Sequence, residues 1–208
     1  MFYPRNGVYF KVRWLNIAPH QLMSDQEIGK KEEERIALDY FIEAYEFTTG
    51  VQLHYVPFVS DSERPDFVCQ TPTGELIGVE ITKVMVRPNV KGELIALGES
   101  TQLGAYEATE AIFAAVEEKE MKRRSPGWSL PDNTILVLQV LDTNVDELEG
   151  FLLDADLRKD FQGFGFHEIW IANHGSVEAY RGVTLFGLYP EQWWGLHERW
   201  NQWEKPYG

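Results

Sequence analysis

Residues 63–86 have the sequence ERPDFVCQTPTGELIGVEITKVMV, which is typical of two short strands joined by a tight turn. We expect the first strand over Asp66–Gln70 and the second over Leu76–Val86. The turn between them, Thr71–Gly74, has proline at its second position and glycine at its fourth, as tight turns prefer. This stretch therefore predicts a β-hairpin, around which the rest of the chain can be arranged.

The second strand of this hairpin carries one carboxylate, Glu80, in the middle of an apolar sequence. A charge in such surroundings is costly unless it has a partner or a metal. Asp66 follows Pro65 at the entrance of the first strand, and neighbouring strands lie about 4.8 Å apart, so Asp66 and Glu80 can converge on one cation. Two simpler interpretations stay open: Pro65-Asp66 is only a turn, or Glu80 lies on the solvated face of a sheet.

The sequence on both sides of the hairpin predicts two helices and two more strands. A capping-box pattern, Ser24 with Glu27, starts a helix that runs to about Thr48, and a strand follows over residues 51–59. A second long helix is expected over residues 101–124, and an apolar strand buried on both faces over residues 134–141. A strand–helix–strand connection of this length implies parallel pairing with a right-handed crossover.

The two ends of the chain add further elements. Residues 7–15 alternate in the manner of a strand, residues 142–160 predict a helix, and residues 168–172 and 182–189 predict strands. Residues 190–203 predict a short terminal helix that contains four tryptophans, Trp193, Trp194, Trp200 and Trp203. We expect these tryptophans to fill the core or cover a sheet edge, and a platform for stacking nucleic-acid bases is the alternative.

The predicted order helix, three strands, helix, strand, together with Pro65-Asp66 and Glu80, resembles the restriction-endonuclease-like phosphodiesterase superfamily, whose motif is written PD-(D/E)xK. The resemblance covers residues 25–142. It implies an α/β fold with a mixed central sheet and an αβββαβ core flanked by helices. Residues 143–208 would extend this core by helix and strands within a single domain spanning residues 1–208, an ordinary length for one domain.

The chain departs from the family motif at Thr82, where the pattern has lysine, and Lys83 comes one residue late on the other face of the strand. In some members of the superfamily the lysine has moved to a neighbouring helix, and the resemblance implies the same here. Lys119 is our first candidate and Lys122 the second, because Lys119 continues the apolar stripe of the second helix one turn beyond Val116. We predict its ammonium within about 6 Å of an oxygen of the acid pair. The alternative is a lysine that snorkels into water.

The resemblance also implies a divalent metal, Mg²⁺ or Mn²⁺, held by Asp66 and Glu80 with the Ile81 carbonyl and Glu33 as further ligands. Glu33 extends the apolar face of the first helix back by one turn, although residues 30–34 can also be read as a solvated charge run. Such a metal would activate water and stabilise charge on a phosphate, and the lysine would orient the water or neutralise the phosphate.

Two functions are compatible with these residues. The first is a metal-dependent nuclease that hydrolyses DNA or RNA. The net charge of −14 argues against a simple nucleic-acid binder and leaves only two local basic patches, Lys119–Arg124 and Arg5–Arg13, to contact phosphates. The second is a catalytically degenerate module of the same fold, acting through a protein partner or as a homodimer, with the Trp-rich C-terminus or the acidic surface as its interface.

The cellular setting is indicated by what the sequence lacks. The single cysteine, Cys69, excludes an intrachain disulfide and predicts a buried thiol in a reducing compartment. The N-terminal residues contain no apolar signal region, and no run reaches the length that spans a membrane. We therefore expect a cytoplasmic protein without a membrane partner.

Overall fold

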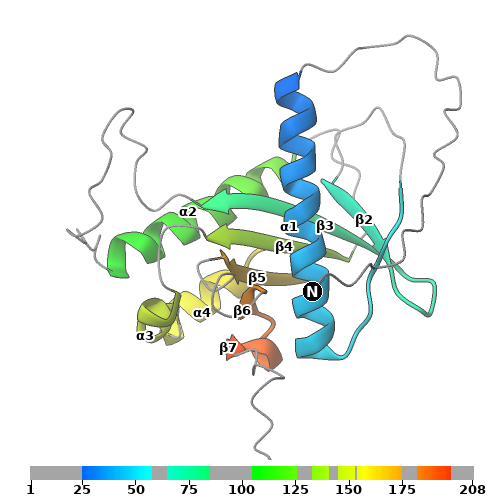
Figure 1. Ribbon diagram of the computed structural model, residues 1–208. Helices are drawn as coiled ribbons and strands as arrows, with labels where there is room; N and C mark the ends of the chain where they lie inside the picture. Colours follow the sequence, from blue (N-terminus) through cyan, green and yellow to red (C-terminus); the bar gives the residue numbers. More distant parts are fainter. Residues whose placement is uncertain are drawn as a thin grey trace, which may run out of the picture.

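Seven strands form one mixed sheet at the centre of the protein, and they lie in the sheet in the order in which they occur along the chain (Figure 1). This computed structural model describes residues 25–57, 65–84, 105–125, 133–140, 145–152, 154–174 and 182–197. Within these residues the strands are β1 His54–Tyr55, β2 Phe67–Gln70, β3 Leu76–Val84, β4 Thr134–Val140, β5 Glu168–Asn173, β6 Thr184–Tyr189 and β7 Gly195–His197.

The predicted hairpin is confirmed as β2 and β3, which pair antiparallel with Phe67 opposite Val79. The turn between them closes through a hydrogen bond from the Gly74 N–H to the Thr71 carbonyl at 2.9 Å, and Gly74 has a φ of +90°, which glycine adopts without strain. Strands β1 and β2 are also antiparallel, whereas β3, β4 and β5 are parallel. Strands β5, β6 and β7 complete the sheet with antiparallel pairs. The predicted α/β class with a mixed sheet is thus confirmed.

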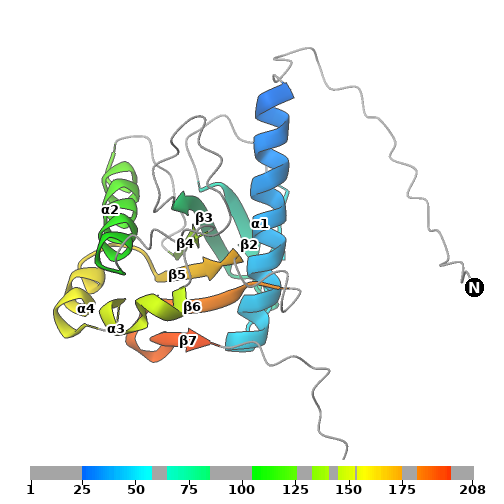
Figure 2. The same cartoon turned by 60° about the vertical axis from the view of Figure 1, so that its left-hand side comes forward.

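Helices cover both faces of this sheet (Figure 2). Helix α1 (Asp25–Thr49) lies on one face, and α2 (Ala105–Arg123), α3 (Glu149–Leu152) and α4 (Ala155–Gln162) lie on the other. Both parallel connections, β3 to β4 and β4 to β5, therefore cross on the same face, as right-handed crossovers must when the sheet grows in one direction. Among the described elements the order α1, β1, β2, β3, α2, β4 is the one that the sequence predicts.

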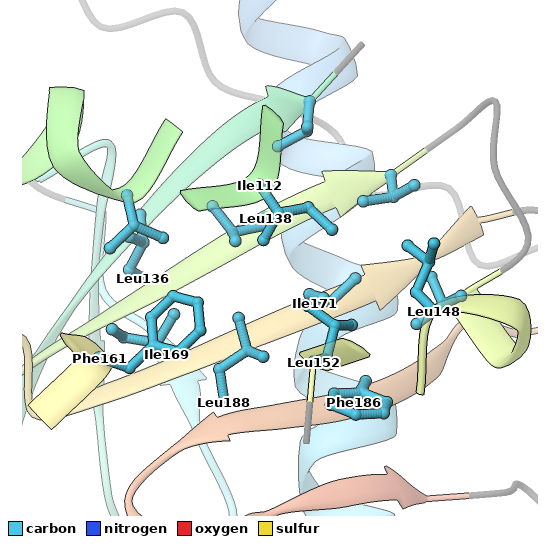
Figure 3. Close-up of a cluster of buried hydrophobic side chains, with 14 of the residues drawn as sticks. Ile112, Leu136, Leu138, Leu148, Leu152, Phe161, Ile169, Ile171, Phe186 and Leu188 are labelled. Atoms are coloured by element: carbon cyan, nitrogen blue, oxygen red, sulfur yellow. The ribbon is translucent and has the colours of Figure 1, made fainter. Parts of the chain in front are cut away.

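Two apolar clusters, one on each face, hold the layers together. The stripes predicted for the two long helices are buried in them, with Phe41 of α1 on one side and Ile112 of α2 on the other both fully buried. Every residue of β4 is buried, as predicted for a strand covered on both faces. Figure 3 shows the cluster on the α2 face, where side chains of the sheet meet those of α2, α3 and α4; it includes Ile112, Leu136, Leu138, Leu148, Leu152, Phe161, Ile169, Ile171, Phe186 and Leu188.

The single helix predicted over residues 142–160 is wrong. A 3₁₀ turn, Val145–Leu148, leads into the short α3, and α4 begins separately after Asp154. The Asp154 carboxylate accepts hydrogen bonds from the Asp156 and Leu157 N–H groups at 2.9 and 3.4 Å, so it caps a new helix. Within α3, Phe151 is 47% exposed, whereas its neighbour Leu152 is fully buried.

The helix predicted over residues 190–203 is also wrong where it can be checked. A short 3₁₀ turn, Glu191–Trp193, is followed by β7, which pairs with β6. Gly195, at the start of β7, has a φ of +107°, which no helix contains. Trp193 packs on Trp170 with ring centroids 5.8 Å apart, in agreement with a role in the core. Trp200, Trp203 and the strand predicted over residues 7–15 lie outside the described residues.

Candidate site between β2, β3 and α2

The sheet register brings Asp66 and Glu80 together. Phe67 lies opposite Val79, so Asp66, one residue before β2, reaches the level of Glu80. The Asp66 N–H donates a hydrogen bond to Glu80 Oε2 at 3.2 Å. Asp66 Oδ2 in turn accepts the Ile81 N–H at 2.8 Å. Each carboxylate thus accepts a backbone N–H from the other side of the hairpin: Glu80 from Asp66, and Asp66 from Ile81.

Pro65 explains why the backbone pairing between β2 and β3 ends at this point. Continuing the register by two residues places Pro65 opposite Ile81, at a position where paired residues exchange both backbone hydrogen bonds. Proline has no N–H to give, so the ladder cannot supply a donor to the Ile81 carbonyl there. The Ile81 N–H donates to Asp66 Oδ2. At the end of the β2–β3 ladder, three oxygen-bearing groups therefore lie close together: the Asp66 carboxylate, the Ile81 carbonyl and the Glu80 carboxylate.

Lys119 completes this group from the opposite direction. Its Nζ lies 2.5 Å from Glu80 Oε1, and the two side chains are 14% and 4% exposed. This confirms the predicted proximity of the Lys119 ammonium to the acid pair. Ala108, Ile112 and Val116 of α2 are fully buried against the sheet, so the stripe that predicts this contact sets the rotation of the helix. We call Asp66, Glu80 and Lys119 the β2–β3 site.

The ion pair between Lys119 and Glu80 compensates a charge that is buried. Glu80 is 3% exposed, so its charge has left water and depends on Lys119 and on the Asp66 N–H for compensation. Asp66 is exposed, so a small charged ligand can reach it from solvent, whereas the side chains of Glu80 and Lys119 are largely buried.

Lys122 lies one turn beyond Lys119 on the same side of α2. Its ammonium is 2.7 Å from Glu118, and both side chains are more than half exposed, at 53% and 63%. The pKa of Lys122 is raised above its ordinary value, first by the hydrogen bond to Glu118 and further by the negative charges of Glu80 and Asp66. The acid pair therefore acts electrostatically on two lysines of α2, which were the first and second candidates from the sequence.

The other cations of the predicted basic patch face away from the site. Glu120, which is 4% exposed, accepts hydrogen bonds from Arg123 Nε and Nη2 at 2.7 and 2.9 Å and from Arg124 Nε at 2.7 Å. It also accepts the Gly165 N–H at 3.2 Å. The Arg123 guanidinium lies so close to Gly165 that a Cβ there would approach it to 1.8 Å. This cluster ties the end of α2 to the loop before β5.

Glu33 does not join the acid pair. Its carboxylate forms an ion pair with Lys83 Nζ at 2.6 Å, and its side chain is 64% exposed. The expectation that Glu33 lies on the buried stripe of α1 is therefore wrong. Lys83 projects from the face of β3 opposite to Glu80, as the alternation predicts, so Glu33 lies across the sheet from the β2–β3 site. Thr82 shares the face of Glu80 and is half-buried.

The remaining oxygens suit a hard divalent cation. Asp66 and Glu80 offer carboxylate oxygens and Ile81 a backbone carbonyl, and Mg²⁺ is typically held by one or two carboxylates with several waters retained. Within the part of the chain that the structure describes, no group of three or more histidine, cysteine or acidic side chains could hold a metal. Asp66, Glu80 and the Ile81 carbonyl are oxygen donors of the kind that Mg²⁺ or Mn²⁺ accepts.

The sequence reasoning missed the Glu120 cluster. Its signal was present, because Glu120 precedes Arg123 and Arg124 by three and four residues, the spacings at which helical side chains meet. The contact with Gly165 lies 45 positions away in the sequence and has no local signature.

Comparison of the chain with models of protein families, with curated proteins and with solved structures finds no match in any of the three. In the parts of the chain placed by the structure, none of the helices combines the length and apolar character needed to cross a bilayer. The function must therefore be argued from the site itself.

Proposed function

We propose that this protein is a divalent-metal-dependent nuclease with a restriction-endonuclease-like core, which hydrolyses phosphodiester bonds of DNA or RNA. One observation carries the proposal: Asp66 just before β2, Glu80 of β3 and Lys119 of α2 meet where the β2–β3 ladder ends. Burying charges costs free energy, and charged side chains of both signs gathered in one place are typical of active sites.

Each residue has a distinct role in this proposal. Asp66, Glu80 and the Ile81 carbonyl would hold the metal, which supplies Lewis acidity toward a phosphate oxygen. Lys119 provides a fixed positive charge beside the reacting phosphate, in a partly buried position where that charge is little screened. Hydrolysis adds water to phosphorus and breaks one P–O ester bond, leaving a phosphate monoester and a hydroxyl. Lys119 orients the water and stabilises the additional negative charge.

The test is cleavage of single- and double-stranded DNA and RNA with Mg²⁺ or Mn²⁺. Cleavage should require the metal and should be lost in Asp66→Asn, Glu80→Gln and Lys119→Met. A matched control is Asp39→Asn, because Asp39 is an exposed acid of α1 in an exposed ion pair with Arg35 at 3.1 Å. A folded wild-type protein that cleaves none of these substrates would exclude the catalytic proposal.

A second candidate function is a binding module with the same fold and no catalysis. Two observations favour it: Thr82 stands where the family motif has lysine, and the net charge is −14. In addition, Glu80 is already neutralised by Lys119 inside the protein, so the acids have a structural role without any metal. Such a module would act through a protein partner or a second copy of the chain. Calorimetric titration with Mn²⁺ separates the two candidates, because only the nuclease requires binding at millimolar concentration.

A further inference from the structure

The four cations at the end of α2 divide into two groups with different uses. Arg123 and Arg124 both donate to Glu120 and face the loop before β5, so their charge is neutralised locally. The Lys119 ammonium forms an ion pair with the Glu80 carboxylate, and both side chains are largely buried. Of these four cations, Lys122 alone has an exposed ammonium on the side of the acid pair.

Helix geometry places Lys122 one turn from Lys119 on α2. Three residues separate it from Lys119, which corresponds to an axial rise of about 4.5 Å. Each lysine adds a flexible four-carbon stem, so the two ammonium groups can reach neighbouring phosphates of one strand. Lys122 is 53% exposed, whereas Lys119 is 14% exposed, so the second phosphate would be bound nearer to solvent than the reacting one.

Glu118 occupies Lys122 in the absence of substrate. The pair is exposed, and exposed pairs of this kind contribute only about 0.3–0.5 kcal/mol on a helix. A phosphate can therefore displace Glu118 at little cost. After displacement, the Glu118 carboxylate stays close to the strand and repels it, so Glu118 weakens binding.

We propose that Lys122 is the substrate-docking cation of the β2–β3 site, which exchanges Glu118 for the phosphate next to the scissile one on a single nucleic-acid strand. This inference rests on the proposed nuclease function and narrows the substrate class. The substrate is a strand with at least two consecutive phosphodiesters, and a lone phosphodiester is a poor substrate.

Binding without turnover gives the direct test. Fluorescence anisotropy of short labelled oligodeoxythymidylate and oligouridylate is measured in EDTA over a series of salt concentrations. Lys122→Ala should weaken binding roughly tenfold at low salt, as for the loss of one charge-assisted contact. It should also reduce the slope of log K against log salt by about 0.7, the value for one phosphate on a single strand. Glu118→Gln should tighten binding.

Lys159→Ala is the matched control, because Lys159 also makes an exposed ion pair, with Asp156 at 3.1 Å, on another helix. It should change neither affinity nor slope. If Lys122→Ala matches Lys159→Ala, or if the wild-type protein binds neither oligonucleotide at low salt, the inference is overturned.

Cleavage assays keep this inference separate from the proposed function. With Mg²⁺, Lys122→Ala should raise KM for a trinucleotide and leave kcat unchanged, while a dinucleotide, which has one phosphodiester, should be unaffected. Wild-type cleavage with no effect of Lys122→Ala would contradict the docking role of Lys122 but not the proposed nuclease function. Binding that depends on Lys122 without any cleavage would contradict the nuclease function and support a protein that only binds the strand.

Discussion

Replacing Glu120 with glutamine should destabilise the protein in a manner that depends on pH. Burial raises the pKa of the Glu120 carboxyl, but hydrogen bonds from Arg123, Arg124 and the Gly165 N–H outweigh it and bring the pKa to about 2. Glutamine keeps the shape and one acceptor oxygen but removes the charge that holds both guanidinium groups. The substitution therefore isolates the electrostatic part of the cluster.

The magnitude follows from the pKa. Its displacement from 4.5 to about 2 corresponds to roughly 3 kcal/mol of stability, at 1.36 kcal/mol for each pKa unit. Arg124 is 66% exposed, so water screens its share, and we expect a measured loss of about 2 kcal/mol. The folded-state pKa lies below that of the unfolded chain. The contribution is therefore fully present above about pH 4.5 and disappears as the pH falls towards 2.

Urea denaturation of the wild type and Glu120→Gln at several pH values between 3 and 7 would measure this difference. The gap in unfolding free energy should be largest at neutral pH and should narrow below about pH 4.5. Asp156→Asn provides the reference, since its exposed i,i+3 pair with Lys159 contributes only a few tenths of a kcal/mol. A gap that stays constant across this range, or that is no larger than that of Asp156→Asn, would refute the reasoning.

Two further predictions concern packing and buried charge. Lys119→Met should cost about 3–5 kcal/mol because it leaves Glu80 charged, buried and without its cation, and the added change Glu80→Gln should restore much of that loss in urea denaturation. Gly187→Ala should cost about 1–3 kcal/mol of stability, because the alanine Cβ would lie 1.9 Å from the Trp193 carbonyl oxygen. Gly150→Ala is the control, because a Cβ there has no atom within 4 Å. Thermal melting should show it to be neutral or slightly stabilising. Equal melting temperatures for the two alanine variants would contradict the packing argument.

The elements that the sequence predicted well are those with strong local signals. The turn at Thr71–Gly74, the stripe of α2 and the uninterrupted apolar run of β4 each reflect one periodicity or one turn preference, and the structure contains all three. Because the stripe of α2 fixes the rotation of the helix, it also placed Lys119 beside Glu80. This part of the site could be predicted because it depends on helix geometry and on the short turn between β2 and β3.

The failures have equally definite causes. Apolar spacing over residues 142–160 fits one helix, but Asp154 satisfies the N–H groups of a new helix start and overrides it. At Glu33, the spacing by three and four continues beyond the part of α1 that is buried against the sheet, so periodicity alone places an exposed residue on the inner face. Contacts between distant segments, such as Glu120 with Gly165, have no periodicity to reveal them.

The position of the β2–β3 site follows from the chemistry of a single residue, Pro65. A hairpin that continued its ladder past Phe67 would use the backbone groups of Ile81 for strand pairing and leave no room for a side chain between the strands. Proline offers no N–H to the Ile81 carbonyl, and the Ile81 N–H donates to the Asp66 carboxylate. The same interruption lets Glu80 accept the Asp66 N–H and meet Lys119 from α2. The charged site therefore lies where the β2–β3 ladder ends, and α2 supplies Lys119 as the ion-pair partner of the buried Glu80.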